Sequence, residues 1–169
     1  MSPSTASSVS AMLTEFKGFF EENDLAKKAA KSIKDGREIE ILVPDAGPVS
    51  DAPLKFTFTK ESGRNVLRDG APTSPDLTFT LPKAAADEIL TTPFESVGQV
   101  GLRIFEKMLS SDPKQKVRAK VHVGFLSLLS GGYLGVLVSG GGDVARFLAS
   151  KGLSSAGKIK DVVSKMKNG

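Results

Sequence analysis

Few residues in this chain of 169 amino acids could carry chemistry. The chain has one histidine, His122, and no cysteine, so a Cys nucleophile, a thiolate metal site and a multi-histidine metal site are excluded. A hydrolytic triad needs a base that a third group holds in place. Strand alternation places His122 on a polar face with Lys116, Arg118 and Lys120. We therefore interpret it as a solvated surface residue.

The acidic residues offer no better catalytic arrangement. Asp87 with Glu88 and Glu21 with Glu22 are typical of solvated pairs on helix surfaces, whereas acid–base catalysis needs carboxyl groups placed in a cleft. The remaining carboxylates lack the spacing of a Mg²⁺ or Ca²⁺ site. The sequence predicts a protein that is not an enzyme, with no cofactor and no metal.

A glycine-rich stretch without charges, VHVGFLSLLSGGYLGVLVSGGG, covers residues 121–142. It lacks the lysine of a phosphate-binding loop, and Asp143 puts a negative charge where a phosphate would lie. A membrane span needs ~20 apolar residues, but the first three residues here belong to a strand, which leaves residues 124–138. We interpret these as a helix. The missing side chains of Gly131 and Gly132 allow either a close approach of another backbone or room for a bulky ligand.

Length and composition predict one main domain. The net charge of +4 is mild, and the absence of tryptophan with a single tyrosine argues against a nucleic-acid partner. The amino-terminal residues lack the features of a secretory signal, which favours a cytoplasmic protein. We divide the chain into a flexible arm (1–10), a single α+β domain (11–153) and a basic amphipathic helix (154–169).

Hydrophobic periodicity predicts the elements. Three- to four-residue spacing indicates helices over residues 11–22 and 25–34, and again over 82–90 and 92–111, where Thr92 and Glu95 could form a capping box. Two-residue alternation indicates strands, which are REIEILV (37–43), LKFTFT (54–59), DLTFTL (76–81) and KVRAKVHV (116–123), and NVLRDG (65–70) could add a short fifth strand. The predicted fold is α+β, with a mostly antiparallel, about five-stranded sheet covered on one face by helices.

Three segments carry a resemblance to a known family: MLTEFKGFFEENDLAKKAAKSIKDGREIEILV, PDLTFTLPKAAADEIL and KVRAKVHVGFLSLL. Their order resembles the sterol carrier protein type 2 (SCP2-like) lipid-binding domain family over about residues 11–137. Members typically have a curved, mostly antiparallel five-stranded sheet and helices around an apolar tunnel. The resemblance implies carriage or presentation of a sterol, fatty acyl chain or isoprenoid.

The same function is indicated by apolar residues on the sheet, on the helix of residues 92–111 and on the glycine-rich helix. The predicted ligand-binding residues are Phe56, Phe58, Phe79, Phe105, Met108, Leu109, Phe125, Leu128, Leu129, Tyr133, Leu134 and Leu137. For each of them the alternative is an ordinary core position. Tyr133 is either a polar group at the pocket mouth or a half-buried core aromatic.

Two further interactions remain open. The carboxyl-terminal helix has an apolar stripe flanked by lysines, and it either docks on an anionic membrane or packs on the domain with its lysines in water; these lysines are Lys158, Lys160, Lys165 and Lys167. The alternative function is a protein-interaction or self-association module, in which residues 124–138 meet a partner helix or a second copy in a homodimer.

Overall fold

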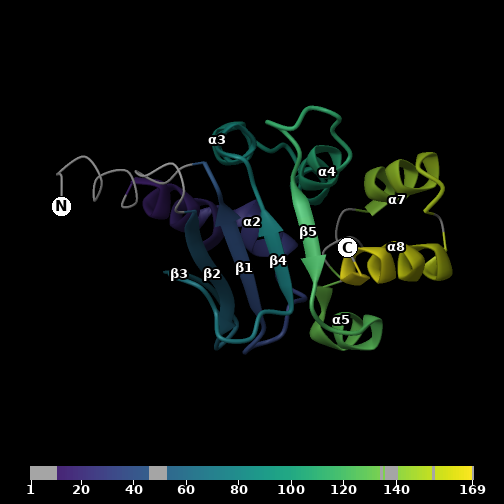
Figure 1. Ribbon diagram of the computed structural model, residues 1–169, viewed down its shortest axis with the longest axis horizontal. Helices are drawn as coiled ribbons and strands as arrows, with labels where there is room; N and C mark the ends of the chain where they lie inside the picture. The colour runs from purple at the N-terminus through teal and green to yellow at the C-terminus, as the bar shows by residue number, and fades with distance from the viewer. Residues whose placement is uncertain (1–10, 46–52, 134, 136–140, 154, 169) are drawn as a thin grey trace.

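The computed structural model describes residues 11–45, 53–133, 135, 141–153 and 155–168. The predicted arm of residues 1–10 lies outside them. Within the described residues the protein is an α+β fold built on one five-stranded sheet of order β3-β2-β1-β4-β5 (Figure 1).

The sheet has β1 (Glu38–Val43) at its centre. On one side β1 is antiparallel to β2 (Leu54–Glu61), which is antiparallel to β3 (Arg64–Asp69). On the other side β1 is parallel to β4 (Leu77–Thr80), and β4 is antiparallel to β5 (Arg118–Val121). The predicted sheet is thus confirmed, and the β1–β4 pair makes it a mixed one.

The described helices lie on one face of the sheet and beyond its β5 edge (Figure 1). Residues 11–17 are α-helical and continue into a π-helical turn. The remaining elements, in chain order, are η1 (Gly18–Glu22), α2 (Asp24–Ala29), α3 (Lys83–Thr91), α4 (Val97–Met108), α5 (Phe125–Gly131), α7 (Gly141–Ser150) and α8 (Ala156–Asn168). No helix among the described residues has the length and apolar character needed to cross a membrane.

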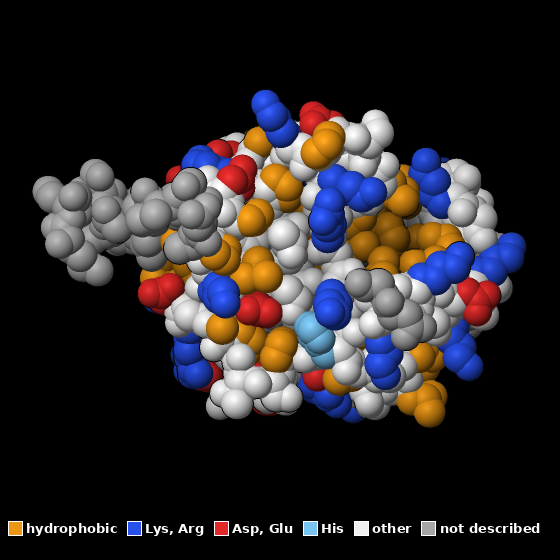
Figure 2. Space-filling model, viewed as in Figure 1, with side chains coloured by type: hydrophobic (Ala, Val, Ile, Leu, Met, Phe, Trp, Pro, Cys, Tyr) orange, Lys and Arg blue, Asp and Glu red, His pale blue; other side chains and the backbone are white. Residues whose placement is uncertain are grey.

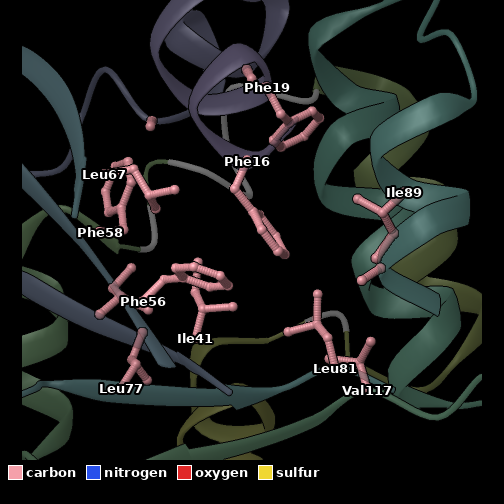
Figure 3. Packing of buried hydrophobic residues seen from close by; sticks show 14 of the residues in the cluster. Phe16, Phe19, Ile41, Phe56, Phe58, Leu67, Leu77, Leu81, Ile89 and Val117 are labelled. Carbon is pink, nitrogen blue, oxygen red and sulfur yellow. The ribbon is translucent and has the colours of Figure 1, made fainter. Parts of the chain in front are cut away.

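The core lies between the sheet and the amino-terminal helices. Phe16 is almost fully buried, and its ring lies 5.2 Å from that of Phe56 on β2. Phe20 makes a similar contact with Phe58, at 5.1 Å. Figure 3 shows Phe16 pointing into the space between these strand residues and Ile89 of α3. Aromatic pairs at such distances add to the free energy gained by burial.

The helix predicted from residue 92 begins later than expected. The structure has α4 starting at Val97, so the Thr92–Glu95 capping box does not form. The side chain of Arg103 instead donates hydrogen bonds to the backbone carbonyls of Thr92 and Pro93, and its guanidinium lies 4.1 Å from the ring centre of Phe94. These contacts with α4 hold the preceding segment in a loop.

The second helix is also shorter than predicted, because α2 ends at Ala29. The residues that follow turn toward α5, where the backbone N–H of Lys34 donates to the carbonyl of Gly131. The close packing of α5 against this turn determines how the glycine-rich stretch is used.

Candidate functional site: an apolar cavity that opens beside the sheet

An apolar cavity of about 260 Å³ lies between the sheet and the helices. Its walls come from every strand except β3 and from the amino-terminal helices, α3, α4, α5, α7 and α8. Apart from Gly101 and Tyr133, the lining residues are aliphatic, phenylalanine or methionine. An apolar cavity of this kind stays dry or takes an apolar ligand.

Strand register builds the floor of the cavity. Ile39 pairs with Phe58 on one side and with Leu77 on the other, so their side chains emerge on the same face of the sheet. Ile41 pairs in the same way with Phe79. The other strand residues in the floor are Ala119 and Val121 of β5.

Small residues explain why this region is hollow rather than filled. Ala29, Ala30 and Ala119 line the cavity, where larger side chains would occupy it. Gly101 lines it from α4, and a Cβ atom built at this position meets no other atom within 4 Å. A glycine inside a helix costs ~1 kcal/mol relative to alanine, and no close backbone contact at Gly101 requires one. Its effect is to leave space.

The mouth of the cavity lies between α4, α7 and α8. Figure 2 shows hydrophobic side chains gathered in a hollow there, beside β5, with Lys and Arg side chains around it. The lining residues at the mouth are half-buried, whereas those of the floor are mostly buried. The half-buried residues are Phe105 and Met108 of α4, Leu148 of α7, Leu153, and Ile159, Val162, Val163 and Met166 of α8.

A polar network borders the cavity at Tyr133. Arg37 immediately precedes β1, and Asp76 immediately precedes β4. Because these two strands are parallel neighbours, the two side chains meet at the amino-terminal ends of the strands. Asp76 Oδ2 accepts hydrogen bonds from the Tyr133 hydroxyl at 2.7 Å and from Arg37 at 3.2 Å. Burial, and then the hydrogen bond to Asp76, raise the pKa of Tyr133 well above its ordinary value of 10.0. The hydroxyl is therefore neutral and committed to Asp76.

The glycines after α5 serve a close approach between backbones. At Gly132, where φ is +86°, a Cβ atom would lie 1.7 Å from the carbonyl oxygen of Ser32. At Gly135 it would lie 2.3 Å from the Ser32 side chain. The Ser32 hydroxyl donates a 2.7 Å hydrogen bond to the Gly132 carbonyl, and this bond stabilises the contact. The space that these two glycines vacate is filled by protein.

The predicted ligand-binding residues fall into three groups. Those that line the cavity are Phe58, Phe79, Phe105, Met108, Leu128 and Tyr133. Those that do not line it are Phe56, which is fully buried in the core, Phe125, Leu109, which is 54% exposed, and Leu129, which is 46% exposed. Leu134 and Leu137 lie outside the described residues.

Sequence reasoning missed much of the wall. The amino-terminal helix contributes Phe16, Phe19 and Phe20. The sequence shows the helical spacing of these residues, but it does not show that they face a cavity. The carboxyl-terminal stripe likewise faces the cavity: it consists of Ile159, Val162, Val163 and Met166. Its apolar spacing was the available signal.

His122 is exposed on the other face of the sheet, as predicted (Figure 2). Its Nε2 atom lies 2.7 Å from the Thr78 hydroxyl, which also lies 2.9 Å from Glu40. Because an ionised carboxylate only accepts, Thr78 donates to Glu40 and His122 Nε2 donates to Thr78. In this arrangement the histidine does not act as a base toward the hydroxyl.

The chain matches no family model, no curated protein and no solved structure. The sheet has the strand number and mostly antiparallel character that the SCP2-like resemblance implies. Membership of that family stays a prediction.

Proposed function

We propose that the protein is a non-enzymatic binder that carries or presents an apolar lipid in this cavity. The observation that carries the proposal is the cavity wall itself, which is hydrocarbon from the sheet to the mouth. Burial of apolar ligand surface contributes roughly 25 cal/mol per Å² to binding. Because the lining is almost entirely apolar, a bound hydrocarbon would remove almost no polar protein group from water.

The volume favours a slender ligand. An engineered apolar cavity of ~150 Å³ holds benzene, so about 260 Å³ corresponds by proportion to roughly ten carbon atoms. An acyl or isoprenoid chain can enter in part and extend through the mouth. A rigid sterol nucleus cannot be divided in this way, so a linear chain is the better fit among the ligands expected from the sequence.

Cavity filling tests the proposal. The purified protein is extracted with organic solvent, the extract is analysed by mass spectrometry, and native mass spectrometry gives the mass of the intact protein. We expect a co-purifying lipid in the wild type and its loss in Gly101→Leu, because the new side chain has open space at the cavity wall. Gly157→Leu is the matched control, since Gly157 is exposed on α8 and does not line the cavity.

Two results would contradict this proposal. One is a wild-type protein that carries no lipid and binds no added decan-1-ol. The other is Gly101→Leu retaining lipid at the level of Gly157→Leu.

Self-association through residues 124–138 has less support. Gly132 and Gly135, which would admit a partner helix, pack against Ser32 of the same chain. The exposed apolar residues of α5 are Leu126, at 77%, and Leu129.

The proposal includes contact with an anionic membrane, but through the lysines of α8 rather than through its apolar stripe. The apolar stripe of α8 lines the cavity, so a membrane would meet chiefly the exposed lysines of this helix. The attraction is then electrostatic, and we expect co-sedimentation with anionic vesicles to fall strongly as NaCl rises, because salt screens exposed charges. Vesicle binding unchanged in high salt would contradict this.

A further inference from the structure

A second hollow, of about 570 Å³, lies along β5, the edge strand of the sheet. It is open to solvent and is lined by Thr80 of β4, by residues 116–120 and by Met108 and Met166. Unlike the first cavity, it has charged side chains in its wall.

The two hollows share a wall. Met108 of α4, Met166 of α8, and Val117 and Ala119 line both of them. As in any strand, successive side chains of β5 project alternately toward the apolar cavity and toward the polar side of the sheet. The boundary between the two hollows is therefore formed in part by these two methionines.

Three cations line this second hollow: Lys116, Arg118 and Lys120. Arg118 and Lys120 are two residues apart on β5 and so lie on one side of it, and Lys116, which precedes the strand, is exposed as they are. None of these three side chains makes an ion pair or a hydrogen bond with a described residue, and no carboxylate lines the hollow. The side chains opposite Arg118 and Lys120 are the uncharged Thr80 and Thr78.

We propose that the two hollows together bind one anionic amphiphile. Its hydrocarbon tail occupies the apolar cavity, and its carboxylate or phosphate headgroup lies among Lys116, Arg118 and Lys120. This inference rests on the proposed function, and it adds a chemical class to the ligand: negatively charged, with a single chain.

The test compares two probes of equal chain length, decanoate and decan-1-ol, by isothermal titration calorimetry below their aggregation limits. The triple substitution K116Q/R118Q/K120Q removes the cations. We expect decanoate to bind roughly tenfold more weakly to this variant, taking about two- to threefold for each exposed charge, while decan-1-ol binding is unchanged. The control is K17Q/K28Q/K31Q, which removes three exposed lysines that line neither hollow, and it should bind both probes as the wild type does.

Two further titrations vary the salt concentration and replace the amphiphile with inorganic phosphate. Raising NaCl from about 0.02 M to about 0.5 M should weaken decanoate binding to the wild type and leave decan-1-ol unaffected. Inorganic phosphate alone should bind far more weakly than decanoate, because it has no tail. Phosphate binding as tight as that of decanoate would identify a site for free anions and overturn the amphiphile.

The two proposals fail in different ways. If neither decanoate nor decan-1-ol binds the wild type, the apolar cavity is not a lipid site and both proposals are wrong. If both probes bind, and the K116Q/R118Q/K120Q variant retains the wild-type affinity for decanoate, the headgroup site is wrong and the apolar cavity stands.

Discussion

Tyr133 connects the two chemical environments of the site. Its ring lines the cavity, and its hydroxyl belongs to the network with Asp76 and Arg37. Nothing in the local sequence predicts this, because Asp76 is 57 positions away. The contact depends on the parallel pairing of β1 and β4, which brings Arg37 and Asp76 together.

The ionisation of Tyr133 is directly measurable, because it is the only tyrosine. Burial raises the folded-state pKa above the ordinary value of 10.0. The neutral hydroxyl therefore contributes to the stability of the folded state. This contribution is fully present below pH 10 and is lost as the pH rises above 10. We expect the near-ultraviolet phenolate absorption to appear only well above pH 10, together with unfolding. Phenolate forming near pH 10 in a protein that stays folded by circular dichroism would contradict the network.

At Gly132 the chain after α5 approaches the Ser32 backbone too closely to admit a side chain. Gly132→Ala should lower the free energy of unfolding by roughly 2–4 kcal/mol, since it combines a positive φ with a collision against the Ser32 carbonyl. Gly101→Ala is the control, because its Cβ has open space within α4, and it should stabilise by about 0.5–1 kcal/mol. Urea denaturation measures both, and equal effects in the two variants would show that the contact with Ser32 is not needed.

The strands were predictable because a sheet with one buried face imposes a two-residue period. Ile39, Ile41 and Val43 are buried, as their alternation indicates. The start of α4 was not predictable, because Arg103 and Phe94 hold the preceding loop through contacts made only in the folded chain. The cavity was predictable as an apolar interior, but its outline depends on which helices close it.

The helix α8 forms one wall of the cavity, and a charge placed in this wall should weaken binding. Val163→Asp puts a carboxylate against hydrocarbon, where its desolvation is costly. We expect decan-1-ol to bind at least about tenfold more weakly, a change of ~1.4 kcal/mol. Ser164→Asp adds the same charge on the exposed side of the helix and should bind normally. Similar affinities for the two variants, measured by calorimetry, would remove α8 from the site.

The whole molecule should gain stability from its ligand. A ligand that binds only the folded state stabilises it by ~2.7 kcal/mol at a concentration of about 100 Kd. Delipidated protein should therefore unfold at a lower temperature and recover on addition of decan-1-ol. Gly101→Leu, whose cavity is filled in advance, should show no such response. A shift of equal size in both proteins would mean that the alcohol acts elsewhere.

The short edge strand β5 has a consequence for behaviour at high concentration. The free edge of a sheet can recruit a strand from another molecule, and charged side chains, lysine above all, oppose this. Arg118 and Lys120 occupy two of the four positions of β5. Neutralising them to test the headgroup site would also unmask that edge, so the K116Q/R118Q/K120Q variant should aggregate at lower concentration than K17Q/K28Q/K31Q. The same cations that would hold a headgroup would thus also oppose the joining of separate molecules into a continuous sheet.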